Sequence, residues 1–281
     1  MAKVVVSVIN YNRVEMLKRC VESVLSTSGG VVFDLLVNDA GSTDGGREWI
    51  EERSKAGAFR ALLDPMPSLG DRPVYSYAEA VNRCAAELFW ANPDGVYYYP
   101  LNNDNMVQPN WLVHCVETFA SDPKIGHVGS SVWYGPSFPQ MSGKIQSAGA
   151  FFKPVSGWTT RSAFVGQQVA PTGIYDVDYC GFGMYRRDLF EKFGGLCTDY
   201  PPIYWDDPDW GFTLWQNGYR VVCDPRSMIV HDHLPNPYVE HERKHHFAPI
   251  GPNKAKFMFK WQGFLHPDGT RSEKLPKVVG C

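Results

Sequence analysis

Five aspartates are the residues best placed for chemistry, because each stands at the end of a predicted strand or the start of a predicted helix. Asp39 follows one apolar run and Asp104 another, while Asp206, Asp207 and Asp209 open a helical pattern. A carboxylate in such a position can accept a hydrogen bond, hold a divalent metal ion or take a proton from a hydroxyl group. The sequence therefore indicates a metal site or an acid–base site beside a sheet.

Each position also has a purely structural explanation. Asp39 opens a polar, glycine-containing run, and an aspartate at a strand end often caps a turn. The polar stretch that contains Asp104 also suits a loop that leads into the next helix. Acidic residues in a first helical turn stabilise the helix dipole. That explanation fits Asp206 and Asp209, which share a helix face, better than Asp207, which points elsewhere.

The elements that must position these residues alternate between strands and helices. Apolar, β-branched runs predict strands, and apolar residues at helical spacing predict helices. The first half shows strands at 3–9, 33–37, 60–63 and 96–101, and helices at 14–25, from the 42–44 turn to about 55, at 76–90, and from Pro109 onward. Such alternation implies an α/β fold whose mostly parallel sheet is covered by helices on both faces.

Local signals predict where helices begin. Asn12 and Glu15 have the spacing of a capping box, one of residues 42–44 suits a helix N-cap, and Pro109 suits a first helical position. The second half shows a strand at 125–133, loops or small antiparallel strands over 134–176, and an aromatic run with two internal glycines at 178–186. Helices follow at 187–193 and 206–216, and then an edge strand with a turn at 221–230.

Composition excludes several classes of protein. The 281 residues are 44% hydrophobic and 20% charged, with a net charge of -3, which indicates a globular chain and gives no general reason to expect nucleic-acid binding. Seven scattered cysteines without CxxC spacing argue against a zinc cluster and a disulfide framework, and for a reducing compartment. No apolar run approaches the roughly 18 residues of a membrane span. We expect a cytoplasmic protein, or one peripheral to a membrane.

A series of ordered motifs resembles the family 2 inverting glycosyltransferases of the GT-A fold. They lie at residues 7–13, 38–45, 101–104, 179–195 with its "RR-x-x-F-x-x-x-GG" helix, 204–210 and 216–221. The resemblance implies a GT-A domain with a Rossmann-like sheet at 1–233, and the C-terminal extension 234–281, which is locally basic. Residues 1–105 would be the nucleotide-binding half and 106–233 the acceptor-binding half. The Asn-Asn-Asp motif is similar to the rhamnosyltransferase-like branch.

The resemblance implies a metal-dependent enzyme that transfers a sugar from a nucleoside-diphosphate sugar to an acceptor hydroxyl by a single displacement. The implied nucleotide-sugar-binding residues are Asn10, Tyr11, Arg13, Asp39, Asn82, Asn103 and Asp104. Asp39 would accept the imide N–H of the base, against which Tyr11 would pack. The donor would carry UDP or dTDP. The acceptor would be a glycan, a lipid-linked sugar or another hydroxyl, with modified DNA an option because the tail is basic.

Mn²⁺ or Mg²⁺ is the implied cofactor, held by Asp104 and by His231, with His233 as an alternative to His231. Asn102 replaces the first aspartate of the family's DxD motif, so Asp104 supplies the one certain anion. The resemblance assigns the catalytic base to Asp207.

The same resemblance places Trp205, Asp206 and Trp210 beside the acceptor. Both tryptophans fit a hydrophobic core equally well.

Three other functions fit parts of the pattern. A nucleotidyltransferase would share the nucleotide-binding half-sheet and a metal, but residues 7–13 lack the glycines of a phosphate-binding loop. The asparagine at position 102 favours a non-catalytic protein that binds nucleotide sugars. A retaining glycosidase would need paired carboxylates, for which the acidic cluster that contains Asp207 is the sole support.

Overall fold

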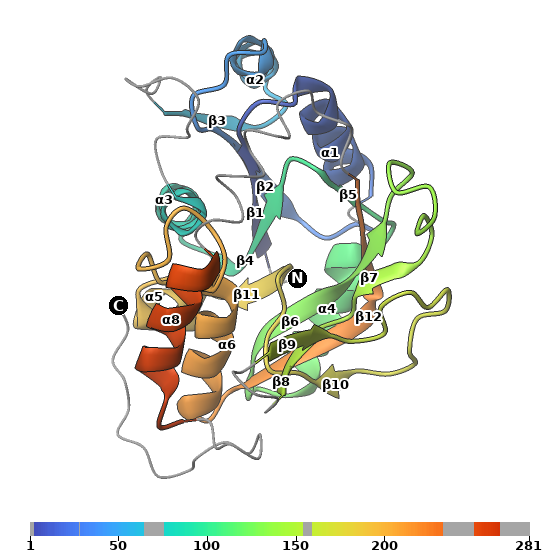
Figure 1. Ribbon diagram of the computed structural model, residues 1–281. Helices are drawn as coiled ribbons and strands as arrows, with labels where there is room; N and C mark the ends of the chain where they lie inside the picture. Colours follow the sequence, from blue (N-terminus) through green and yellow to red (C-terminus); the bar gives the residue numbers. More distant parts are fainter. Residues whose placement is uncertain (1–2, 28, 65–75, 154–158, 233–249, 265–281) are drawn as a thin grey trace.

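The computed structural model describes the chain except for residues 1–2, 28, 65–75, 154–158, 233–249 and 265–281 (Figure 1). Its centre is one large sheet in the order β10-β12-β6-β11-β4-β1-β2-β3. These strands are β1 (Lys3–Asn10), β2 (Phe33–Asp39), β3 (Arg60–Leu63), β4 (Gly95–Asn102), β6 (Ile125–Tyr134), β10 (Tyr175–Asp176), β11 (Gly183–Arg186) and β12 (Arg220–His231). Strands β3, β2, β1 and β4 run parallel, as do β6 and β12, whereas β11 lies antiparallel between β4 and β6.

Two short strands extend this sheet, and a separate hairpin lies beside it. Strand β5 (Asn105–Val107) pairs with β12, and β7 (Ile145–Ser147) pairs with β6. Strands β8 (Ala150–Lys153) and β9 (Thr159–Ser162) form the hairpin. The small antiparallel strands expected over 134–176 are therefore present.

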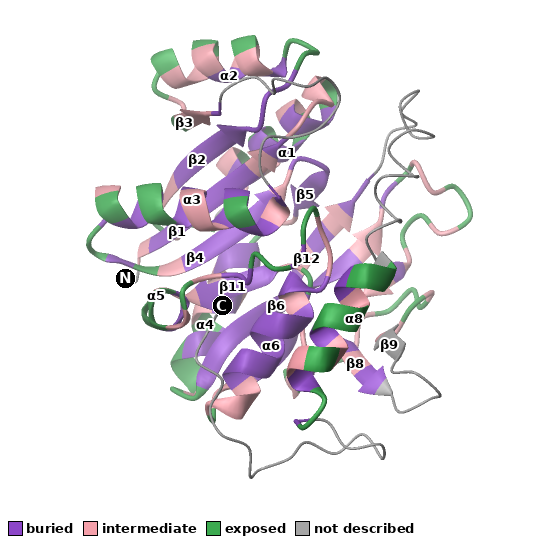
Figure 2. Cartoon of the chain, turned by 60° about the vertical axis from the view of Figure 1, so that its left-hand side comes forward, coloured by how far each residue is buried: buried purple, intermediate pink, exposed green. Residues whose placement is uncertain are grey.

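Helices cover both faces of the sheet, which confirms the predicted α/β architecture (Figure 2). The helices are α1 (Val14–Ser26), α2 (Gly46–Lys55), α3 (Tyr77–Ala91), α4 (Trp111–Ser121), α5 (Arg187–Phe193), α6 (Asp206–Gln216) and α8 (Ile250–Trp261). One core cluster joins the sheet to α1, α2 and α4, and a second joins it to α3, α5 and α6. Strands that are buried on both faces explain the continuous apolar runs in the sequence.

Helix starts differ from the sequence predictions, and a side chain distant in sequence caps α1. Asn12 and Glu15 form no capping box: Arg13 is the N-cap residue, in a left-handed conformation, and Asp44 accepts from the amide of Val14 at 2.8 Å. Helix α2 has Gly45 as its N-cap. In contrast, Ser76 and Glu79 form a complete capping box for α3.

Two further boundaries are corrected. Helix α4 begins at Trp111, after a left-handed Asn110, and not at Pro109. The predicted edge strand at 221–230 lies inside the sheet as β12, with β6 on one side and β5 and β10 on the other. Sequence alone showed a strand there but could not show its neighbours.

Part of the predicted C-terminal extension packs onto the domain. Helix α8 lies alongside α6 in both ribbon views (Figures 1 and 2). A third hydrophobic cluster joins them, made mostly of the aromatic residues Phe152, Tyr200, Trp205, Phe212, Phe257, Trp261 and Phe264. Residues 233–249 and 265–281, including His233 and most of the basic tail, lie outside the described residues. No helix of the described chain is long and apolar enough to cross a bilayer.

The cysteines follow the sequence prediction in part. Five of the seven are free and buried, at positions 20, 84, 115, 180 and 223. Cys197 is disulfide-bonded, which the sequence analysis did not predict.

Candidate active site at the strand ends

The site lies where parallel strands end at the same edge of the sheet. Asn10 on β1 pairs in register with Asp39 on β2, and Ile9 pairs with Asn102 on β4. Because parallel strands point their carboxyl ends the same way, three polar segments that are far apart in sequence meet here.

Asn10 joins these strand ends through both ends of its amide. Its Nδ2 donates to Asp39 Oδ1 at 3.0 Å and to Ser42 Oγ at 3.1 Å, and its Oδ1 accepts from Asn103 Nδ2 at 2.7 Å. Asn10 and Asp39 are fully buried and Asn103 nearly so. The structure thus brings together three of the predicted nucleotide-sugar-binding residues.

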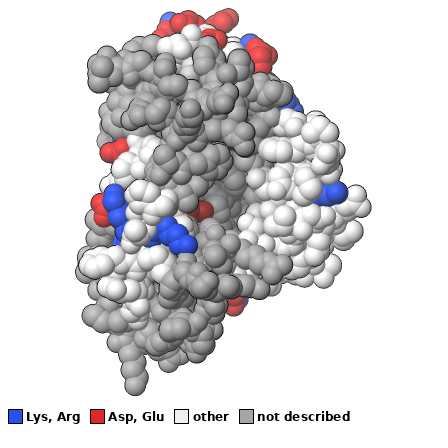
Figure 3. Space-filling view, viewed as in Figure 1, with Lys and Arg blue, Asp and Glu red and all other residues white. Residues whose placement is uncertain are grey.

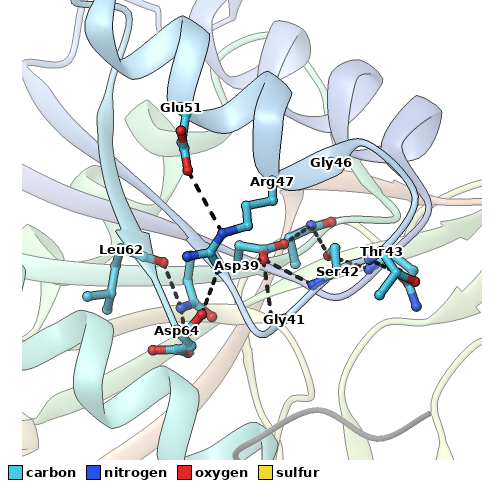
Figure 4. A network of polar contacts seen from close by, with 12 residues as sticks. Asp39, Gly41, Ser42, Thr43, Gly46, Arg47, Glu51, Leu62 and Asp64 are labelled. Atoms are coloured by element: carbon cyan, nitrogen blue, oxygen red, sulfur yellow. Dashed lines mark hydrogen bonds and ion pairs between the residues drawn. The ribbon is translucent and has the colours of Figure 1, made fainter. Parts of the chain in front are cut away.

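The carboxylate of Asp39 organises the turn that follows β2. Its Oδ2 accepts from the amides of Gly41 at 3.2 Å and Ser42 at 3.0 Å, and lies 3.6 Å from Arg47 (Figure 4). These contacts match the turn-capping explanation of Asp39. Its predicted contact with the nucleotide base remains a prediction, and any ligand there would share an already engaged carboxylate.

The turn between β1 and α1 has an unusual backbone. Asn12 and Arg13 have φ values of 56° and 63°, in the left-handed region. Asn12 stabilises the turn with two hydrogen bonds. Its side-chain Oδ1 accepts from Thr43 N at 2.9 Å, and its backbone N–H donates to Ser42 Oγ at 2.7 Å. Arg13 then lies with an NH1 nitrogen 3.5 Å from Asp104 Oδ2. The predicted residues Tyr11 and Arg13 are therefore at this edge of the sheet.

Asp104 and His231 form the candidate metal pair. The Nε2 atom of His231 lies 3.4 Å from Asp104 Oδ2, and both side chains are almost fully buried. The Nδ1 atom of His231 is 2.8 Å from Gln146 Oε1. An amide oxygen can only accept, so Nδ1–H donates to Gln146 and Nε2 is the ring nitrogen that faces Asp104. The ring thus presents Nε2 to the candidate metal position.

The donor set suits Mg²⁺ or Mn²⁺ when phosphates complete the shell. One carboxylate and one imidazole is a small protein contribution, and the described residues contain no cluster of three or more His, Cys, Asp or Glu side chains. Such ions are often bound by one or two protein groups plus substrate phosphates. In addition, Asn102 Oδ1 is buried without a hydrogen-bond partner, two residues before Asp104. The residues present therefore fit the implied ion.

Asp206 and Asp207 lie in the first turn of α6 with perturbed acidity. Burial raises the pKa of Asp206 from 3.8 to about 6, with a smaller contribution from the nearby charge of Asp209. Burial and the charge of Asp206 raise the pKa of Asp207 well above its usual range. A buried carboxylate with a raised pKa is a stronger base, as proton abstraction requires. The side chain of Asp207 reaches Gly181: a Cβ atom added at this glycine would lie 3.3 Å from Asp207 Oδ2.

Other predicted residues have structural roles in this structure. Asn82 exchanges two hydrogen bonds of 2.8 Å with the backbone of Leu196 and so ties α3 to the end of α5. Trp210 is 2% exposed within the core beneath α6, and Trp205 belongs to the cluster beneath α8. Neither tryptophan presents an open face to an acceptor here, in agreement with the core alternative. Asp209 accepts from Tyr200, Lys260 and Trp261.

Tyr77 is a site residue that sequence reasoning missed. It is the first residue of α3 and it is partly buried. Burial and the charges of Asp206, Asp207 and Asp104 raise the pKa of its phenol. The charges of both Asp104 and the acid pair therefore act on the phenol of Tyr77. A tyrosine at a helix start carries no signal in the sequence, and neither does Gln146, which comes from a segment without clear periodicity.

Charge is unevenly distributed around these elements. Acidic side chains, with a few basic ones among them, lie over α2, while Lys and Arg side chains lie near α5 and α8 (Figure 3). Helix α2 carries Glu48 in its first turn, and α8 carries Lys260 in its last.

Comparison with known proteins agrees with this geometry. Residues 5–194 match glycosyl transferase family 2. The chain belongs to this family. No curated protein matches the chain as a relative. Family membership supports the prediction of a glycosyltransferase that uses a nucleotide sugar, and the fold is the GT-A fold that the motifs implied.

A solved structure with the same fold is the crystal structure of GalNAc-T7 with UDP, GalNAc and Mn²⁺. The two superpose with a TM-score of 0.67 at 13% sequence identity, covering 93% of this chain. This chain spans 48% of the length of that one. At such low identity the likeness establishes the fold, and it assigns neither donor nor acceptor.

Proposed function

We propose that this protein is a metal-dependent inverting glycosyltransferase that moves a sugar from a nucleoside-diphosphate sugar to an acceptor hydroxyl in one displacement. The observation that carries the proposal is the pair Asp104 and His231, with Nε2 3.4 Å from the carboxylate and the imidazole ring held by Gln146. The acid pair at the start of α6 and the carboxylate of Asp104 both act on the phenol of Tyr77. The two pairs supply the two functions that the reaction needs.

Asp104 and His231 would hold Mn²⁺ or Mg²⁺, and the ion when bound would neutralise charge on the leaving diphosphate. Arg13, 3.5 Å from Asp104, adds a fixed positive charge beside the same position. Asn10, Asn103 and Asp39 would shape the nucleotide pocket, with Tyr11 against the base. Since Asn82, Trp205 and Trp210 are engaged within the protein, we do not retain them as ligand contacts.

Asp207 would take the proton from the acceptor hydroxyl as its oxygen attacks the anomeric carbon. Its raised pKa makes it a stronger base than a solvent-exposed aspartate, and Gly181 leaves space beside it. Asp206, one residue earlier, keeps the site anionic and would face the acceptor.

The donor is proposed to be a UDP- or dTDP-linked sugar, and a deoxyhexose if the chain is of the rhamnosyltransferase-like branch. The acceptor would be a glycan, a lipid-linked sugar or another hydroxyl compound. We also propose the division into a nucleotide-binding half, residues 1–105, and an acceptor-binding half, residues 106–233. A cytoplasmic or peripheral membrane location would suit such substrates.

The test is a panel of nucleotide sugars with Mn²⁺, comparing the wild-type protein with Asp207→Asn and with Asp94→Asn. Asp94 is an exposed aspartate just before β4, paired with Lys3. We expect Asp207→Asn to lower kcat about 100- to 10,000-fold while nucleoside diphosphate still binds, and Asp94→Asn to behave as wild type.

The stereochemistry of the product tests the inverting mechanism. The anomeric configuration, measured by NMR on the first product formed, should be opposite to that of the donor. Retention of configuration would refute the single displacement. Absence of both binding and turnover across the panel would refute the glycosyltransferase assignment.

A further inference from the structure

The segment 199–205 leads directly into α6 and therefore delivers the acid pair Asp206 and Asp207 to the site. Its last two residues, Tyr204 and Trp205, have φ values of 72° and 81°. Non-glycine residues occupy this left-handed region only when surrounding contacts hold them there. We call residues 199–205 the α6 entry loop.

The backbone carbonyls of the α6 entry loop are bound by two helices. Lys256 Nζ donates to the carbonyl of Asp199 at 2.7 Å, and Asn253 Nδ2 donates to those of Pro201 at 3.2 Å and Ile203 at 3.1 Å. From the other side, the amide of Tyr77 donates to the carbonyl of Pro202 at 2.9 Å. Side chains of α8 thus hold three carbonyls of the loop.

Asn253 is the central member of these contacts. It is 2% exposed, and its Nδ2 group bonds two carbonyls that lie two residues apart in the loop. One amide thereby fixes the loop on both sides of Pro202. Removal of this amide takes the donor from both carbonyls at once and would favour a rearranged loop.

The body of α6 does not depend on these contacts. Trp210, Phe212 and Leu214 anchor the helix in the core. Helix α8 is itself anchored through Phe257 and Trp261 and through the bonds of Lys260 and Trp261 to Asp209. Loosening the loop would therefore displace Asp206 and Asp207 at the start of α6 and leave Asp209 and the rest of the helix in place.

We propose that Asn253 is a positioning residue for the acid pair, acting through the α6 entry loop, and that α8 serves as the clamp that carries it. This inference rests on the proposed function, with Asp207 as the base. It assigns a role to the C-terminal helix, which lies outside the matched family region of residues 5–194.

The experiment compares Asn253→Ala, Lys256→Met and Phe264→Leu in the full chain. Phe264 packs against Phe212 and Trp261 in the cluster beneath α8 and has no bond to the loop, so its variant controls for loss of stability. We would measure kcat, the donor KM, the Kd of the nucleoside diphosphate, the thermal midpoint and the pH profile of kcat.

We expect Asn253→Ala to lower kcat by about 10- to 100-fold with donor KM and nucleotide Kd unchanged, because a small misplacement of a base is costly. Asn253 bonds the entry loop, and within the described residues its bonds reach none of the strand-end residues Asn10, Asp39 and Asp104. Lys256→Met, which removes one bond from an exposed side chain, should show a smaller loss in kcat. Phe264→Leu should lower the thermal midpoint and leave kcat unchanged.

The pH profile distinguishes positioning from simple destabilisation. The ionisable groups that interact with the acid pair are Asp209 on α6, Tyr77 on α3, Tyr185 on β11, and Cys180, Tyr200 and Tyr204 from neighbouring loops. A displaced first turn lets water reach the carboxylates, so the rise of kcat with pH should move to lower pH in Asn253→Ala. The profile of Phe264→Leu should match wild type.

Hydrogen exchange provides a readout that does not need transferase activity. The amide of Asp209, bonded to the carbonyl of Trp205 at 3.1 Å, should exchange faster in Asn253→Ala than in Phe264→Leu. Equal exchange, or an unchanged kcat and pH profile in Asn253→Ala, would overturn the inference. A wild-type protein without transferase activity would instead refute the proposed function, and exchange would still decide the role of Asn253.

Discussion

Replacing Asp206 with asparagine should stabilise the protein, and increasingly so as the pH rises. The side chain is 4% exposed, and burial raises its pKa from 3.8 to about 6. Between these two pKa values the folded state binds a proton that the unfolded state has released. Stability therefore falls as the pH rises through this interval, and the loss is complete above pH 6 and absent below pH 3.8. An asparagine at this position carries no charge and avoids the loss.

The size of the effect follows from the shift. About two pKa units at 1.36 kcal/mol each give about 3 kcal/mol as an upper value for the charge of Asp206. Removing that charge also relieves Asp207, whose pKa is raised in part by Asp206, and this acts in the same direction. Carboxylates with lowered pKa values, such as Asp224 and Asp232, lower the stability of the fold as the pH falls. They do so equally in the wild-type protein and in Asp206→Asn, so their contributions cancel in the difference.

Urea denaturation at pH 4, 5, 6, 7 and 8 measures this difference. The free energy of unfolding of Asp206→Asn minus that of wild type should be small near pH 4 and rise toward about 3 kcal/mol at pH 7. Asp94→Asn, with an exposed side chain, should show no such rise. A difference that is independent of pH, or that favours the wild type at pH 7, would refute the reasoning.

Two further predictions concern the strand ends. Asp104→Ala should weaken the Mn²⁺-dependent binding of nucleoside diphosphate at least about 10-fold, because it removes the one anionic ligand. Calorimetric titrations with and without EDTA measure this binding. Equal binding by the wild-type protein and Asp104→Ala would contradict this role. Asn10→Ala removes the hydrogen bonds to Asp39, Ser42 and Asn103. In urea denaturation it should lower the free energy of unfolding by about 3 kcal/mol. A loss below about 1 kcal/mol would show that these hydrogen bonds do not hold the strand ends together.

The sequence predicted most of the fold because its elements are locally encoded. The strand 3–9 and the helix 14–25 agree with β1 and α1 to within a residue. The helix N-caps were missed because their partners are distant, as with Asp44 on the amide of Val14. Motifs placed Asp104 and His231 at the site, since strand ends and residue types are visible in sequence.

The roles of single residues depend on neighbours that sequence does not show. Asn82 matches a family position, yet both polar atoms of its amide are bound by Leu196. Asp209 continues the acidic motif, yet it accepts from Lys260 and Trp261 of α8. In each case a long-range contact decides between ligand binding and structural support, and local pattern carries no information about it.

The three aspartates of the acidic cluster therefore differ in their bonding partners. Asp209 accepts from the cation Lys260 and from two further donors, and it serves as the anchor for α8. Asp206 is buried and Asp207 partly buried, and both have raised pKa values and no ion pair among the described residues. Uncompensated buried charge is unfavourable for folding, so a stable fold retains it where another requirement outweighs the loss. Proton removal from an acceptor is such a requirement. Two variants thus test the same arrangement. Asp206→Asn measures what the charge of the acid pair costs in stability, and Asp207→Asn measures what it contributes to kcat.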